Sequence, residues 1–150
     1  MFKITKKGYN KLQEELKFLL EVERPRVLEL LQNYRVIGEV DMLEDTDYIS
    51  ARNEQDNIEN RIIYISNLIS ESKVVSIKDH YDTVEFGATI TLLDCDTDEE
   101  RTYQVVSSIE SNPSQGLISI ESPIVKELLG CAVGEFAYHN DKEFELIKIL

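Results

Sequence analysis

The sequence predicts an α+β protein, in which a long helical hairpin precedes a small, mostly antiparallel sheet packed on one short helix. Three observations carry this prediction. Apolar residues recur every three or four positions up to about residue 75, and short alternating stretches follow. The charge changes at the same place: residues 1–76 hold 11 bases and 14 acids (net −3), while residues 77–150 hold 5 bases and 15 acids (net −10). We therefore expect two domains, 1–76 and 77–150.

The first helix should run from Lys6 to about Ile37. Thr5 is suited to cap its N-terminus, because its hydroxyl can accept a hydrogen bond from a free backbone amide. Pro25 lacks a backbone donor and usually kinks a helix, so we expect a bend or break near Glu23–Arg26. The apolar positions of this helix are Tyr9, Leu12, Leu16, Leu19, Val27, Leu31 and Tyr34.

The second helix shows the alternating three-and-four spacing of a heptad seam. About 25 residues at a rise of 1.5 Å give a rod of roughly 35–40 Å. Two such helices joined by a short polar bend fold back as an antiparallel coiled coil, with residues 38–47 at its tip. The seam positions are Tyr48, Ala51, Gln55, Ile58, Ile62, Ile65, Ile69 and Ser72.

After a polar linker that contains His80, the pattern is that of strands. Turns are expected at 96–100 (DTDEE) and 112–116 (NPSQG), and a short helix at 122–130, which begins with Ser-Pro and stops at Gly130. The expected strands cover 83–94, 101–109, 116–122, 134–140 and 142–150.

Composition excludes several classes of function. The net charge of −13 argues against generic binding to duplex DNA or RNA, which needs a basic face, although a partner that already carries nucleic acid stays open. No apolar run approaches the ~18 residues of a membrane span, and the N-terminus lacks the apolar core of a signal peptide. We expect a cytoplasmic protein with no membrane partner, in which Cys95 and Cys131 are reduced thiols.

The residues offer no stand-alone active site. The two histidines, His80 and His139, both lie in polar segments where we expect them to be exposed, and neither cysteine sits in a thiol motif. The acidic run at 94–100 lacks the central glycine and the terminal bidentate glutamate of a calcium loop, so we interpret it as a solvated turn. The protein is therefore not expected to be an enzyme on its own.

The acidic bend is the candidate site. Carboxylate oxygens suit Mg²⁺, but a hairpin tip cannot enclose an ion, so these acids alone would hold it weakly. Inserted into a cavity that already contains one metal, they could complete a second metal site beside a phosphate. The alternative is a charge-rich turn that only keeps the loop solvated. The five acids of the bend are Glu39, Asp41, Glu44, Asp45 and Asp47.

Several segments along the chain match the pattern of one known family, in the same order. In the first half these are ITKKGYNKLQEELKFL, ERPRVLELL (which accounts for Pro25 within a helical pattern), RVIGE and DYISARNEQDNIENRI. In the second half they are FGATITLLD, TYQVV, GLISIESPIVKELLG and VGE. On these segments, the chain resembles the GreA/GreB family of bacterial transcript cleavage factors over nearly its whole length.

The resemblance implies an N-terminal antiparallel coiled coil and an FKBP-like C-terminal domain that binds RNA polymerase. The coiled coil would enter the secondary channel of the polymerase when the enzyme has backtracked and the nascent RNA 3′ end blocks synthesis. Its tip acids would help to hold a catalytic Mg²⁺ shared with the polymerase active site, so that the polymerase cleaves its own transcript. The free protein would bind no metal, and we expect a monomer.

The resemblance also assigns the tip residues. The family tip reads Gly-Asp-Leu-x-Glu-Asn-x-Glu-Tyr, and this tip is two residues longer between its anchors. Counting back from Tyr48 gives Glu44 and Asp41 as the metal-assisting pair, with Asp45 in place of the asparagine, whereas counting forward from Gly38 gives Glu39 instead of Asp41.

Arg35 and Arg52 match basic family positions, where they would contact RNA phosphate or the channel wall; the alternative is that they are ordinary surface charges. Two other functions stay open. One is a Gre-like factor whose extended acidic tip inhibits polymerase from the same site. The other is a prolyl isomerase or chaperone-like module, which would need an aromatic-lined pocket in the second half.

Overall fold

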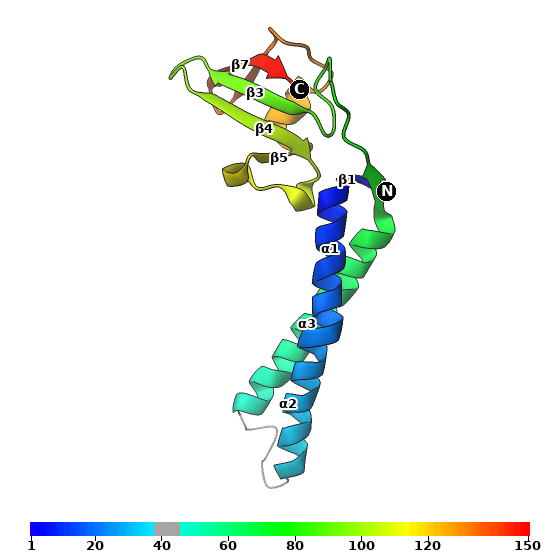
Figure 1. The fold of residues 1–150 in the computed structure, drawn as a ribbon. Helices are drawn as coiled ribbons and strands as arrows, with labels where there is room; N and C mark the ends of the chain where they lie inside the picture. The colour runs from blue at the N-terminus through cyan, green and yellow to red at the C-terminus, as the bar shows by residue number, and fades with distance from the viewer. Residues whose placement is uncertain (38–45) are drawn as a thin grey trace. The chain divides into compact units, whose positions relative to one another are not determined.

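The computed structural model describes the backbone of residues 1–37 and 46–150, and the side chains of 1–34 and 46–150. Figure 1 follows the chain from β1 to β7. The helical hairpin followed by a sheet with a short helix confirms the predicted fold class. Contacts divide the chain into two compact units, one of Met1–Gly8 with Ser72–Leu150 and one of Tyr9–Glu71. The domain boundary at residue 76 stays a prediction. It rests on a change in hydrophobic periodicity and charge, whereas the two units are defined by their contacts.

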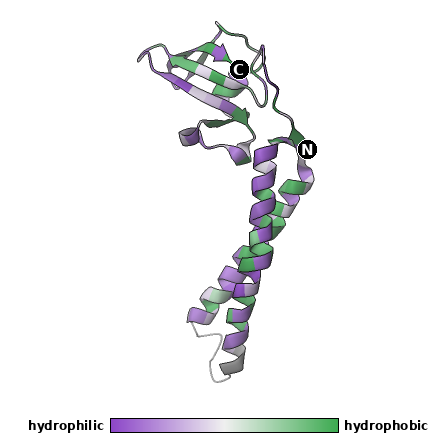
Figure 2. Ribbon diagram, in the orientation of Figure 1, coloured by the Kyte–Doolittle hydropathy of each residue, from purple (hydrophilic) through white to green (hydrophobic). Residues whose placement is uncertain are grey.

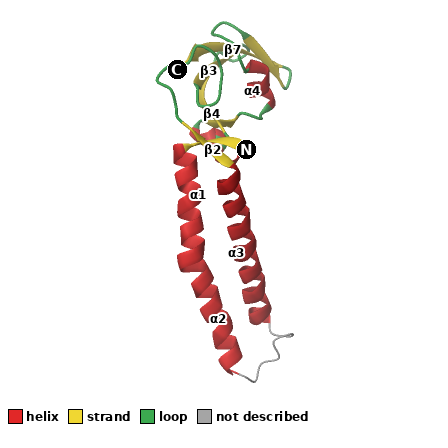
Figure 3. Ribbon diagram, turned by 90° about the vertical axis from the view of Figure 1, so that its right-hand side faces the viewer, coloured by secondary structure: helices red, strands yellow, loops and turns green. Residues whose placement is uncertain are grey.

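The hairpin consists of three helical segments on one side and one long helix on the other (Figure 3). α1 (Lys6–Phe18), a π-helical turn η1 (Leu19–Glu23) and α2 (Arg24–Ile37) run out, and α3 (Thr46–Glu71) returns. Figure 2 shows hydrophobic and hydrophilic residues interleaved along these helices, as expected for an amphipathic pair. The seam buries Leu19, Val27, Leu31, Ala51, Ile58, Ile62 and Ile65.

The expected irregularity near Pro25 is present, but it lies on the N-terminal side of the proline. The amide of Arg24 donates to the carbonyl of Leu19, five residues back, which closes the π-helical turn. Pro25 has no amide to donate, and its ring clashes with the carbonyl four residues earlier in a regular helix. Widening the preceding turn relieves that clash. Of the two predicted outcomes, a bend or a break, the structure shows no break: a π-helical turn ends at Glu23 and α2 begins at Arg24.

Three cross-helix ion pairs flank the seam. Arg24 donates to both carboxylate oxygens of Glu59 at 2.8 Å, and Arg61 donates to both oxygens of Glu15 at 2.7 and 3.1 Å. Arg26 forms the third pair, with Glu54. These side chains are more than a third exposed, so the Arg24–Glu59 and Arg61–Glu15 pairs each stabilise the hairpin by no more than about 1 kcal/mol. The two hydrogen bonds in each of the Arg24 and Arg61 pairs still favour one register of the two helices.

The sequence did not predict β1 (Phe2–Thr5) and β2 (Ser72–Val75), which pair in parallel beside the two ends of the hairpin helices. Four-residue strands are too short for a period-two pattern to stand out. The predicted cap at Thr5 is confirmed, because the amide of Gly8 donates to the Thr5 hydroxyl oxygen at 3.1 Å.

Within the unit of Met1–Gly8 and Ser72–Leu150, a carboxylate far along the chain contacts this first helical turn. Glu110 accepts hydrogen bonds from the amide of Thr5 at 3.3 Å and from the Thr5 hydroxyl. It also accepts from the amide of Ser107 at 3.3 Å and from the Ser107 hydroxyl at 2.6 Å. A Cβ at Gly8 would overlap the Glu110 side chain, so this network requires glycine there. We call Thr5, Gly8, Ser107 and Glu110 the Glu110 network.

The sheet has the strand order β5-β4-β3-β7-β6 and is antiparallel except between β4 and β5. The helix α4 (Pro123–Leu128) contributes three buried side chains to the sheet's core, Ile124, Val125 and Leu128, alongside Ile90, Val105 and Leu146. The strands are β3 (Thr89–Asp94), β4 (Glu100–Val106), β5 (Leu117–Ser119), β6 (Phe136–His139) and β7 (Lys142–Ile149).

All five predicted strands and the short helix are therefore present, but each strand is shorter than predicted. Residues 83–88 are not extended, since Gly87 adopts φ 91° in a turn just before β3. Residues 108–110 form a 3₁₀ turn, η2 (Ser108–Glu110), which holds Glu110 against Ser107. Among the described helices, none is long and apolar enough to cross a membrane.

Candidate functional site

The candidate metal-binding acids at the end of the hairpin fall in the segment between α2 and α3. Glu39, Asp41, Glu44 and Asp45 lie outside the described residues, so their assignment stays a prediction. Within the described residues, no group of three or more His, Cys, Asp or Glu side chains is placed to hold a metal ion. The structure does describe the two helix ends that carry the acidic segment.

An aromatic contact joins these two helix ends. The rings of Tyr34 on α2 and Tyr48 on α3 meet edge to face, with centroids 5.9 Å apart and planes at 77°. Leu31 and Ala51 are buried one turn further along the seam. The rings therefore hold together the helix ends from which residues 38–45 depart. The sequence placed both tyrosines on the seam but did not predict their ring contact.

Asp47 has a local reason to be acidic. It lies exposed in the first turn of α3, where a negative side chain interacts favourably with the free amides and the positive end of the helix dipole. That position explains one of the five acids of the bend without a metal. It leaves the other four to be explained.

Arg52 differs from the other described arginines of the hairpin. Its guanidinium donates to the side-chain oxygen of Gln55, one turn along α3, and is exposed. Arg24, Arg26 and Arg61 are all held in cross-helix ion pairs, whereas Arg52 forms no ion pair with any carboxylate in the described part of the chain. Most of its donors are therefore available to an anion. Arg35 lies near the end of α2, and its side chain is outside the described ones.

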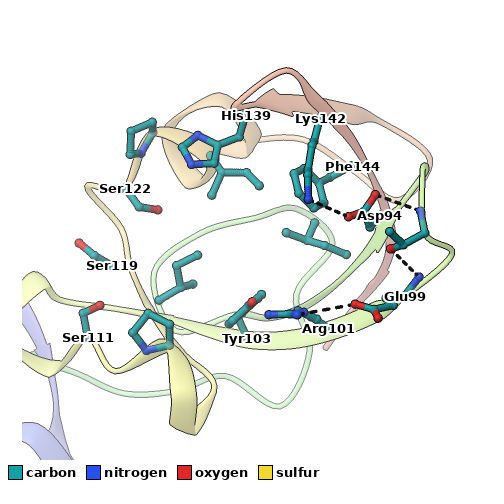
Figure 4. A pocket seen from close by; sticks show the side chains of 16 residues that line it. Asp94, Glu99, Arg101, Tyr103, Ser111, Ser119, Ser122, His139, Lys142 and Phe144 are labelled. Atoms are coloured by element: carbon teal, nitrogen blue, oxygen red, sulfur yellow. Dashed lines mark hydrogen bonds and ion pairs between the residues drawn. The ribbon is translucent and has the colours of Figure 1, made fainter.

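The sheet unit contains a pocket of about 440 Å³ between the sheet and the loops around α4 (Figure 4). Charged side chains line one end, where Lys142 lies 3.9 Å from Asp94 and Arg101 lies 3.6 Å from Glu99. The hydroxyl oxygen of Ser122, also in the lining, is buried with no partner among the described residues. The apolar lining comprises Leu92, Tyr103, Pro113, Ile118, Pro123, Ile124 and Phe144.

The sequence did not reveal this pocket, because its lining comes from several strands and loops that are far apart in the chain. Two of the five aromatic residues beyond the linker, Tyr103 and Phe144, contribute to it. His139, the last residue of β6, also lines the pocket and is half-buried, which corrects the prediction of an exposed histidine. His80 is exposed as predicted, 2.8 Å from Asp82.

The cysteines are packing residues. Both are free thiols, as predicted, and Cys131 packs against the core of the sheet. Burial raises the pKa of each thiol, and neighbouring carboxylates (Glu143 and Glu145 at Cys95, Glu135 at Cys131) raise it further. At neutral pH both stay protonated, and the thiolate form that acts as a nucleophile is disfavoured.

Comparisons with known proteins match both halves of the chain. A family model described as "Transcription elongation factor, N-terminal" matches residues 2–74, and one described as "Transcription elongation factor, GreA/GreB, C-term" matches residues 78–149. The transcription elongation factor GreA of Nautilia profundicola is 41% identical over 133 residues, 88% of this chain and 81% of that protein. GreA of Helicobacter pylori is 40% identical over 148 residues, 95% and 88% of the two chains.

Among solved structures, GreA factor homolog 1 of Thermus thermophilus matches with a TM-score of 0.45 and 27% identity. The match covers 99% of this chain and 98% of that one.

Proposed function

The chain belongs to the GreA/GreB family of transcription elongation factors, and from this premise we propose that it is an accessory factor of RNA polymerase. It binds the polymerase through its sheet domain and inserts the hairpin into the secondary channel. There it stimulates the polymerase's own cleavage of backtracked transcripts. The protein acts in the cytoplasm as a monomer, and it performs no chemistry without the polymerase.

The observation that carries this proposal is the braced hairpin that ends at the acidic segment. α3 has 26 residues, which corresponds to a rod roughly 39 Å long. Its partner side is continuous helix from Lys6 to Ile37, because the π-helical turn absorbs Pro25 without a break. A rod of this length is able to carry residues 38–45 into a channel too narrow for a globular domain.

The tip acids supply oxygen ligands once they are inside the polymerase. Asp41 and Glu44 are the proposed pair, with Glu39 and Asp45 as alternatives, and their carboxylates suit Mg²⁺, which retains waters and accepts few protein ligands. The ion, shared with the polymerase active site, would activate a water for attack on the RNA phosphate. The free protein is proposed to bind no metal.

The two arginines near the tip are proposed to contact the nascent RNA 3′ end. Arg52 is exposed and lacks a carboxylate partner among the described residues, so it can donate to a phosphate without giving up an ion pair. A guanidinium can donate two parallel hydrogen bonds to phosphate oxygens. Arg35 is proposed for the same role from its place near the end of α2.

A backtracked elongation complex with 5′-labelled RNA tests the proposal directly. Adding the protein with Mg²⁺ should shorten the labelled transcript, and the shortened product should be extended again when nucleotides are supplied. Slower synthesis without cleavage would contradict the proposal and support the inhibitory alternative. Binding to the polymerase is measured separately, so that a loss of cleavage is not confused with a loss of affinity.

Three single variants decide which acids act. Asp41→Asn and Glu44→Gln should each lower the cleavage rate by about a hundredfold while polymerase binding persists. Asp56→Asn, an exposed acid on α3, is the matched control and should leave cleavage unchanged. If Glu39→Gln abolishes cleavage and Asp41→Asn does not, Glu39 is the partner of Glu44.

A further inference from the structure

The outer strand of the sheet exposes two aromatic rings. β6 is an edge strand, and its Phe136 and Tyr138 are 46% and 63% exposed. Between them, Ala137 is fully buried in the core of the sheet. Since side chains alternate along a strand, both rings lie on the face of the sheet opposite this core.

Carboxylates surround these rings. The cross-strand partners on β7 are Glu145 opposite Phe136 and Glu143 opposite Tyr138. The Tyr138 hydroxyl donates to Glu143 Oε1 at 3.1 Å, and the Tyr138 amide donates to Glu127 Oε1 at 3.3 Å. Tyr138 therefore has one carboxylate at its hydroxyl and another at its backbone. We call these five residues, Glu127, Phe136, Tyr138, Glu143 and Glu145, the Tyr138 surface.

The negative charge of this surface is not compensated nearby. Its three glutamates form no ion pair with a basic side chain in the described residues. By contrast, two acids that line the pocket are paired: Asp94 with Lys142 and Glu99 with Arg101. The hydrogen bond from Tyr138 to Glu143, followed by that carboxylate's charge, raises the pKa of the tyrosine. The pKa of nearby Cys95 rises through burial first and then through Glu143 and Glu145. The local field is therefore negative.

We propose that the Tyr138 surface binds an arginine-bearing segment of a protein partner. A planar guanidinium can stack on an exposed tyrosine or phenylalanine ring while its edge donates to a carboxylate beside that ring. Tyr138 and Glu143 offer both elements already joined by a hydrogen bond, so little ordering is needed on binding. Lysine can supply the charge, but it lacks the planar fork that matches a carboxylate.

Other occupants fit this surface poorly. A purely apolar partner would bury three carboxylates without compensation. A nucleic-acid backbone would be repelled, because it carries the same sign of charge. A second copy of the chain that met this surface across a two-fold axis would place like charges against each other. The hairpin and residues 38–45, which carry the proposed cleavage function, are not part of the Tyr138 surface. Binding there would therefore be a separate contact with a partner.

Peptide titration followed by nuclear magnetic resonance tests the proposal on the full chain, without polymerase. The probe is a blocked peptide, Gly-Arg-Gly-Arg-Gly, with lysine and glutamate versions of the same length. The arginine peptide should shift the amide signals of residues 127 and 136–145, and it should bind more tightly than the lysine peptide. The glutamate peptide should not bind.

Two variants test whether the arginine peptide binds at the Tyr138 surface or is only attracted by the negative charge of the whole protein. Tyr138→Ser and Glu143→Gln should each lower the affinity of the arginine peptide by about fivefold, since each removes one element of the stacked contact. Glu29→Gln removes an exposed acid on α2 and should change the affinity by less than about twofold. Equal weakening by all three variants, shifts spread over distant acidic segments, or equal affinity for arginine and lysine peptides would overturn the proposal.

Discussion

The two ends of the hairpin helices are held by contacts of opposite character. Where α1 begins, the carboxylate of Glu110 accepts four hydrogen bonds from Thr5 and Ser107, which are 6% and 4% exposed. Where α2 ends and α3 begins, two half-buried rings, Tyr34 and Tyr48, meet edge to face. One end is fixed by a charged network and the other by an aromatic contact.

This difference predicts how each end responds to change. A half-buried charged network fails as a unit, because removing its acceptor leaves several donors without partners at once. Replacing one ring of an aromatic pair by another apolar side chain removes the geometric preference of that pair, which is worth about 0.5–1.5 kcal/mol. We therefore expect the start of α1 to be sensitive to single substitutions and the far end to be tolerant of them.

The largest effect is expected for Glu110→Ala. The substitution leaves the amides and hydroxyls of Thr5 and Ser107 without their acceptor, which should lower the free energy of unfolding by about 3 kcal/mol. Hydrogen exchange at the Thr5 and Gly8 amides measures this locally. Glu121→Ala is the control, since Glu121 also accepts a serine hydroxyl bond, at 2.7 Å, but is exposed. Equal losses in both variants would contradict a special role for Glu110.

The next largest effect is expected for Gly8→Ala, and its sign should depend on Glu110. With Glu110 present, the added methyl group overlaps its carboxylate and should cost about 1–2 kcal/mol, because the network must shift. In the Glu110→Ala background that obstacle is gone, and alanine should stabilise the helix by up to about 1 kcal/mol over glycine. A double-mutant cycle with thermal unfolding measures this reversal. A destabilising Gly8→Ala in both backgrounds would mean that another contact requires the glycine.

The Glu110 network shows what could be predicted at the start of α1 and what could not. Thr5 was predictable as a cap, because capping depends on residues within one helical turn. Glu110 lies 105 positions away, and no local pattern connects it to Thr5. Gly8 looked like an ordinary helical residue, since the reason for it lies in a different part of the fold. Periodicity predicts elements, and it does not predict which distant side chains meet.

The candidate site divides in the same way. The helices that carry the acidic segment were predictable from the heptad seam, and the carboxylates from composition. The sequence could not predict that Arg52 is available to bind an anion, because this depends on which arginines pair with a carboxylate across the hairpin. The pocket beside α4 could not be predicted either, since its lining converges from separate strands and loops.

A smaller effect is expected at the aromatic end of the hairpin. Tyr34→Leu keeps an apolar side chain but removes the edge-to-face contact with Tyr48, which should cost about 1 kcal/mol. Tyr34→Phe keeps the ring and should cost less. Urea unfolding followed by circular dichroism at the helical wavelength compares the two variants. Equal losses would show that the ring contact is not what stabilises this end.

The smallest effect is the pH response of the Arg24–Glu59 pair. The hydrogen bond from Arg24, with its charge, lowers the pKa of Glu59 in the folded hairpin below the ordinary value of about 4.3. A carboxyl group with a lowered folded pKa binds its proton more readily when unfolded. The pair therefore contributes its full stability above about pH 5 and loses it as the pH falls through the folded pKa.

Because both partners are more than a third exposed, the contribution should be only about 0.5 kcal/mol. Glu59→Gln should remove it, so the difference in free energy of unfolding between wild type and variant should shrink as the pH falls from 6 to 3. Urea unfolding across that range measures the difference. Asp56→Asn, an exposed acid on the same helix, should show no comparable trend. If the difference in free energy of unfolding stays constant with pH, Glu59 acts through packing. The cross-helix pairs would then favour one register of the helices without adding stability that depends on their charge.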